Sequence, residues 1–71
     1  MKQFDPLNDV PTTDDEAEIC LKYGKQELIG KNLIGIYKVQ KLRGEDILTS
    51  YAYALETYLR IIKEKEGKQN E

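Results

Sequence analysis

The segment from Ile47 to Ile62 carries two neighbouring apolar stripes at heptad spacing, whereas a helix on the surface of a domain needs only one. Each stripe advances by alternating steps of four and three residues, and together they cover about half of the helix circumference. A chain of 71 residues has little other material to bury so wide a face. We therefore expect part of the face to contact a second copy or another protein, and we predict dimerisation through this helix. One stripe contains Leu48, Ala52, Leu55, Leu59 and Ile62, and the other contains Ile47, Tyr51, Ala54, Tyr58 and Ile61.

Length and composition indicate one small soluble domain. A chain of this size buries only about 60% of its unfolded surface, so it is marginal as a lone unit. The single Cys20 excludes an internal disulfide, which favours a reducing cytoplasm over secretion. The N-terminus lacks the apolar core of a signal peptide, and no stretch approaches 18 uninterrupted apolar residues. We expect a cytoplasmic protein with no membrane span.

The net charge of −2 conceals three segments of alternating sign. Residues 1–18 have a net charge of −5, residues 19–44 a net charge of +5, and residues 45–71 a net charge of −2. Such a layout suits an acidic arm that lies on the basic middle segment, an acidic partner for that segment, or simply a solvated surface. The possible basic surface consists of Lys22, Lys25, Lys31, Lys38, Lys41 and Arg43.

The pattern predicts an all-α fold, a small three-helix domain or a helical hairpin plus a short helix, behind a flexible N-terminal arm. Two prolines and scattered polar residues make residues 1–12 a flexible acidic arm. Thr13 and Glu16 have the form of a capping box that starts a helix. The helical domain spans 13–67, with helices near 14–29, 33–43 and 46–66, and residues 68–71 form a polar tail.

Glycines and polar caps indicate where these helices stop and start. Gly24 on the apolar side of the first helix either permits close packing or ends that helix. Gly30 suits the left-handed position after a helix, and Asn32 suits the N-cap of the next. Gly44, after two cations, marks the end of the second helix.

The segment 33–42 is ambiguous, because its β-branched and aromatic residues also suit a strand. The alternative is therefore an α+β fold with a short hairpin at 27–42. We favour a helix, since a lone hairpin has no third strand with which to pair.

The residue types argue against an enzyme. The chain has no His, so the usual general base and the commonest transition-metal ligand are both missing. Cys20 lacks a His to activate it and lies on the apolar side of the first predicted helix, where a small buried residue belongs. The acidic run Asp14–Glu18 lacks the spacing of a calcium loop, and helix-start electrostatics accounts for it. We predict no catalytic residue, no metal site and no cofactor.

The remaining hypothesis is a small protein-binding factor, that is, an adaptor, inhibitor or regulatory subunit, that uses the apolar, Tyr-bearing face of its last helix. A nucleic-acid-associated regulator using the basic 22–43 segment is an alternative, although a pI near 5.1 disfavours it. A structural assembly subunit is a third. Tyr53 and Arg60 lie on the polar side of the helix, where they either stay exposed or anchor a partner. The predicted partner-binding residues are Tyr51, Tyr53, Leu55, Tyr58, Leu59, Arg60 and Ile62.

Overall fold

The computed structural model describes residues 3–69, with side chains for residues 3–67. This part of the chain contains helices and turns and no strand. The predicted all-α fold is therefore confirmed, and the hairpin alternative at 27–42 is wrong because the segment 33–42 is helical. The elements are α1 (Asp14–Leu21), the irregular turn η1 (Lys22–Gln26), α2 (Glu27–Ile29), α3 (Leu33–Leu42) and α4 (Ile47–Gln69).

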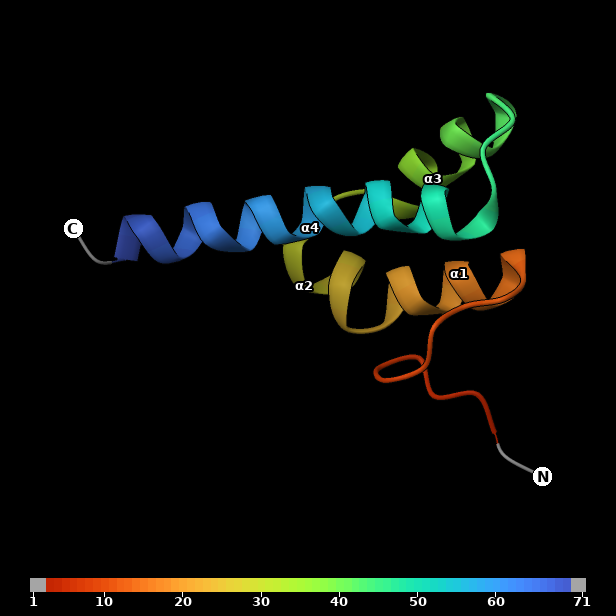
Figure 1. Cartoon of the computed structure of the whole chain (residues 1–71). Coiled ribbons are helices and arrows are strands. Elements are labelled where there is room, and N and C mark those ends of the chain that lie inside the picture. The colour runs from red at the N-terminus through yellow and green to blue at the C-terminus, as the bar shows by residue number, and fades with distance from the viewer. Residues whose placement is uncertain (1–2, 70–71) are drawn as a thin grey trace.

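The long helix α4 lies along the whole molecule and organises the fold (Figure 1). Helices α1 and α3 pack against its N-terminal half, and α2 lies near its middle. The last turns of α4 extend beyond α2 with no other helix beside them (Figure 1). At 1.5 Å per residue, the 23 residues of α4 span roughly 35 Å, far more than the short helices can cover.

Helix α1 begins as predicted. Thr13 adopts extended backbone angles, and its hydroxyl accepts a hydrogen bond from the Glu16 backbone N–H at 3.1 Å. The carboxylate of Glu16 reaches one residue further back than a capping box requires, because it accepts from both the backbone N–H and the hydroxyl of Thr12 at 2.8 Å. These bonds fasten the end of the arm to the first turn of α1.

The predicted continuous helix over 14–29 is wrong, and the alternative that Gly24 ends the first helix is correct. The chain leaves the helix at Tyr23, with ψ of 122°, and Gly24 has φ of +74°. A side chain is strained at that angle, and a Cβ there would lie only 3.1 Å from Cδ2 of Leu7. The ammonium group of Lys25 then donates to the carbonyl of Cys20 at 3.2 Å. This bond satisfies a carbonyl at the end of α1.

Helix α3 begins and ends close to the predicted residues. Gly30 has φ of +68°, as predicted for the left-handed position after a helix. The side chain of Asn32 caps α3 by accepting from the Gly35 N–H at 2.9 Å. A Cβ on Gly35 would lie 2.8 Å from the amide nitrogen of Asn32, so Gly35 leaves room for the cap. After α3, Gly44 turns the chain with φ of +94°, as predicted.

Helix α4 is longer than predicted. It runs through Gly67 to Gln69, because a glycine in a helix costs only about 1 kcal/mol and no Pro follows it. The predicted polar tail 68–71 therefore begins inside the helix, and residues 70–71 lie outside the described residues. At the other end, Oδ1 of Asp46 accepts from the Thr49 N–H at 2.7 Å and caps the helix.

The capping hydrogen bond of Asp46 predicts that the stability of the fold depends on pH. Hydrogen bonding with the side chain and backbone of Thr49 holds the pKa of this carboxyl below its ordinary value of 3.8. Because the pKa is lower in the folded state, the ionised carboxylate stabilises the fold at pH values above the unfolded-state pKa. This contribution disappears as the pH falls through the lower, folded-state pKa. Since Asn accepts the same cap bond without the charge, we expect wild type to be more stable than Asp46→Asn at neutral pH. Urea unfolding of both chains at pH values from about 7 down to about 2 should show that difference vanish at the acid end. A difference independent of pH would contradict the assignment.

The core lies where α1, α2, α3 and α4 meet. Leu21, Leu33 and Ala54 are fully buried, one from each of the longer helices, and Tyr37 is almost so. Cys20 is also fully buried, which confirms the core role predicted for it, and burial raises the pKa of its thiol. Ala17 and Ile29 complete the buried core cluster.

One polar contact joins α1 to α3 at the edge of this core. The hydroxyl of Tyr37 donates to Oδ1 of Asp14 at 2.5 Å, and Nζ of Lys41 lies 3.9 Å from the same oxygen. Burial of the ring, together with the hydrogen bond to Asp14, raises the pKa of Tyr37 well above its usual range. The phenol therefore stays protonated and remains a donor to the carboxylate.

The N-terminal segment 3–12 has no helix, as predicted, but it lies against the domain. Pro11 is fully buried. The thiol of Cys20 donates to the carbonyl of Asp9 at 3.8 Å, and the Asp5 N–H donates to the Asp9 carboxylate at 2.9 Å. The flexibility of this arm stays a prediction. Its position beside α1 and α4 adds surface next to the start of α4.

Candidate interaction surface

The two stripes of α4 have different environments. The stripe of Ile47, Tyr51, Ala54, Tyr58 and Ile61 faces the core, and we call it the inner stripe. Ala54 is fully buried, and the other four are partly buried against the core cluster.

The other stripe, which we call the outer stripe, contains Leu48, Ala52, Leu55, Leu59 and Ile62. Leu48 and Leu59 are each 55% exposed, Ala52 between them is exposed, and Leu55 is partly buried. Ile62 packs against the edge of the core cluster. Three of the five residues of the outer stripe, Leu48, Ala52 and Leu59, are thus open to solvent over about three turns of helix.

The predicted partner-binding residues occupy three environments. Leu55, Leu59 and Ile62 belong to the outer stripe. Tyr51 and Tyr58 belong to the inner stripe, with each ring only partly exposed, and burial raises the pKa of the Tyr51 hydroxyl. Their contact with a partner stays a prediction, limited to the exposed part of each ring.

Tyr53 and Arg60 form the third environment, on the polar side of α4. Tyr53 is 52% exposed and Arg60 is exposed, as the helical wheel predicted. The carbonyl of Tyr53 accepts from the Thr57 hydroxyl at 3.4 Å, and this contact lies within α4 itself. This pair is therefore separate from the outer stripe and is accessible independently of it.

The arm extends the outer stripe at its N-terminal end. Val10, Pro11 and Thr12 line a groove of about 360 Å³ together with Asp46, Ile47 and Leu48 from the start of α4. Val10 is 64% exposed, so its side chain adds apolar surface next to Leu48. Sequence reasoning missed this contribution, because no periodicity relates an arm residue to a helix that begins 37 positions later.

The predicted basic surface is partly neutralised by α1. Lys41 lies against Asp14, and the ammonium group of Lys25 donates to a backbone carbonyl. Lys38 and Lys41 border a depression of about 320 Å³ together with Asp14 and Glu18 of α1. Lys22, Lys31 and Arg43 are exposed. Acids of α1 therefore lie beside Lys38 and Lys41, and the nucleic-acid alternative stays a prediction.

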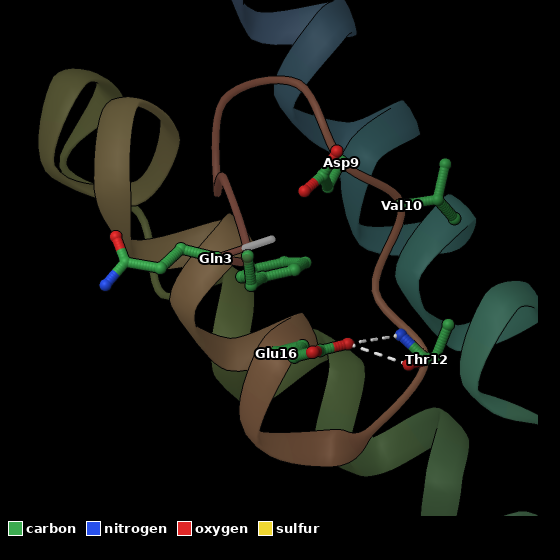
Figure 2. A pocket seen from close by; sticks show the side chains of 6 residues that line it. Gln3, Asp9, Val10, Thr12 and Glu16 are labelled. Carbon is green, nitrogen blue, oxygen red and sulfur yellow. Dashed lines mark hydrogen bonds between the residues drawn. The ribbon is translucent and has the colours of Figure 1, made fainter. Parts of the chain in front are cut away.

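The pocket between the arm and α1 is lined mainly by polar residues. Its lining residues are Gln3, Phe4, Asp9, Val10, Thr12 and Glu16, around about 350 Å³ (Figure 2). Figure 2 shows the Glu16 carboxylate directed at Thr12, which donates two hydrogen bonds to it. Its other carboxylate, Asp9, accepts from the Asp5 N–H. Glu16 thus fastens the arm to α1, whereas the Asp9 carboxylate holds two residues of the arm together.

Among the described residues, no group of three or more Cys, Asp or Glu side chains is placed to hold a metal ion. None of the described helices combines the length and the apolar character needed to cross a membrane.

The sequence matches no protein-family model, and comparison with curated proteins and with solved structures finds no match.

Proposed function

We propose that the protein is a small non-enzymatic protein-binding factor, an adaptor, inhibitor or regulatory subunit, that acts through the outer stripe of α4. The observation that carries the proposal is the alignment of Leu48, Ala52, Leu55 and Leu59 along one open side of a helix that already buries its other apolar side. Large apolar residues scattered singly on a surface need no explanation, whereas a line of them at heptad spacing is the pattern of a helix that packs against another helix.

The shape of the molecule supports this proposal. The last turns of α4 project beyond α2, so a partner can approach them from several sides (Figure 1). A projecting amphipathic helix is a recurring means of protein recognition, in which residues at heptad spacing contact an apolar surface of the partner. A cytoplasmic location belongs to the same proposal and is supported by the single, buried Cys20.

The proposal is tested by comparing two variants that introduce the same charge at different exposed leucines. Leu59→Asp places a carboxylate on the outer stripe, and Leu42→Asp places one on α3, where the side chain is 88% exposed and off the stripe. Each chain is immobilised and incubated with an extract of the source cells, and the retained proteins are quantified by mass spectrometry. Circular dichroism first checks that both variants keep the helical content of wild type.

We expect proteins retained by wild type and by Leu42→Asp to be lost from Leu59→Asp, because a buried unpaired carboxylate opposes association. The double variant Tyr53→Ala/Arg60→Ala reports separately on the polar side of α4. If Leu59→Asp retains the same proteins as wild type while the Tyr53 and Arg60 variant loses them, the binding surface is the polar side and the proposal is wrong.

A further inference from the structure

The chain exposes more surface than a folded monomer of its mass. Its accessible surface is 5345 Å² for 8.2 kDa. Folded monomers of this mass expose about 4,500 Å², so the excess is roughly 800 Å². A standard protein interface buries about 800 Å² on each partner. The excess belongs to the whole chain, arm included, and it equals in size the surface that one ordinary interface covers on each partner.

We propose that the partner of the outer stripe is a second copy of this chain, and that the two α4 helices pack antiparallel through this stripe about a two-fold axis. The inference rests on the proposed function, since it names the first partner of the same surface. It also assigns the register: Leu48 of one copy lies opposite Leu59 of the other, and Ala52 lies opposite Leu55.

The heptad spacing of the stripe supports a helix pair. Steps of four and three residues keep a stripe nearly parallel to the helix axis, which is the condition for two helices to stay in contact over several turns. On α4 the apolar residues Leu48, Ala52, Leu55 and Leu59 repeat in this way; the first, second and fourth are exposed, and Leu55 is half-buried. An identical stripe on a second copy is complementary to it in both length and polarity.

The residue sizes and charges favour the antiparallel register over a parallel one. In a parallel pair each residue meets its own copy, so Ala52 faces Ala52 and leaves a thin layer. Glu66, which follows Ile62 by four residues on the same line, would then face Glu66 of the other copy, and like charges at that separation repel. In the antiparallel register Ala52 meets the larger Leu55, and Glu66 passes beyond the end of the partner's stripe. Thr49 then lies near Glu56 of the other copy, where its hydroxyl is a suitable donor.

The groove at the arm supports the same orientation. An antiparallel pair brings the C-terminal half of one α4 to the start of the other, beside the groove between Val10 and Leu48. Leu59 of the second copy then covers Leu48, and Ile62 of that copy lies next to Val10. In this arrangement the end of α4 that extends beyond α2 lies beside the arm of the other copy (Figure 1).

The first test is the mass of the full chain in solution, measured by sedimentation equilibrium over about two decades of concentration. We expect wild type and Leu42→Asp to have twice the 8.2 kDa mass of the chain at the upper concentrations. Leu48→Asp and Leu59→Asp should remain monomeric, with a dimer dissociation constant raised by more than about 100-fold, because each charge enters the interface twice. Circular dichroism checks that these variants, altered at half-exposed positions, keep their fold.

The second test uses Leu48→Cys and Leu59→Cys and fixes the orientation. In the antiparallel register, a mixture of the two single-cysteine variants forms a disulfide-linked heterodimer under mild oxidation, and neither variant cross-links alone. In a parallel pair each variant cross-links alone. Wild type, whose Cys20 is buried, is the control for background oxidation.

The outcomes separate this inference from the proposed function. A monomer at every concentration overturns the dimer, and if Leu59→Asp still abolishes capture of other proteins, the proposed function remains. A dimer that survives Leu59→Asp, or one in which each cysteine variant cross-links alone, overturns the assigned antiparallel stripe contact. A heterodimer cross-link together with a monomeric Leu59→Asp supports it.

Discussion

Leu33→Ala is expected to lower the free energy of unfolding by about 2 to 5 kcal/mol, because it removes a fully buried side chain and leaves a cavity. Leu33 opens α3 and belongs to the cluster shared by α1, α3 and α4. A chain of 71 residues has a total stability of roughly 4 to 10 kcal/mol at typical values per residue. The single change therefore removes a large part of the stability of the domain.

Urea unfolding followed by circular dichroism measures this loss, at one fixed protein concentration because association also stabilises the folded chain. Leu42→Ala is the matched control, since the same chemical change at an 88% exposed position of the same helix is expected to stay within about 0.5 kcal/mol of wild type. Equal losses in the two variants would show that α3 does not bury Leu33 as described.

Ala54→Leu is expected to destabilise the fold by about 1 to 3 kcal/mol, because three added carbons must fit where α4 packs closely against the core. Ala54 is fully buried at the centre of the inner stripe. Ala52→Leu is a close control, since it makes the same change two residues earlier on the same helix, at an exposed position. Helix propensity cancels between the two variants, and the difference reports packing alone.

Both alanine variants are best compared in the Leu59→Asp background, where the proposed dimer contributes nothing to stability. Thermal unfolding should place the midpoint of the Ala54→Leu chain below that of the Ala52→Leu chain, by roughly 4 to 8 °C for each kcal/mol. If Ala52→Leu is the more damaging change, the inner and outer stripes have been assigned the wrong way round.

Local signals predicted most of the secondary structure. Thr13, Asn32, Gly30 and Gly44 act at the positions where their side chains, or the lack of one, suit a cap or a turn. Such preferences depend on a few neighbouring residues, so they can be read directly from the sequence. The same reasoning did not decide whether Gly24 lies within the first helix or ends it. That outcome depends on the path of the following residues and on the arm residue Leu7, which lies beside Gly24.

The candidate surface was only half predictable. The double stripe indicated that α4 carries more apolar surface than one small domain needs, and the partner-binding role of Leu55, Leu59 and Ile62 stays a prediction. It did not show that Tyr51 and Tyr58 would face the core, since the two stripes have the same spacing and nearly the same composition. Nor did it place Val10 beside α4, because that contact joins segments far apart in the chain.

The sequence by itself determined the all-α class, the caps and turns near each helix, and the excess of apolar surface on the last helix, because helix propensity, capping and periodicity act over one or two turns. Only the tertiary structure decided which stripe of α4 is open, where the first helix breaks and where the arm lies. These outcomes depend on how α1 and α3 pack on α4. The two stripes are offset by only one residue, and the short helices distinguish them because they bury Ala54 and leave Leu48 and Leu59 exposed.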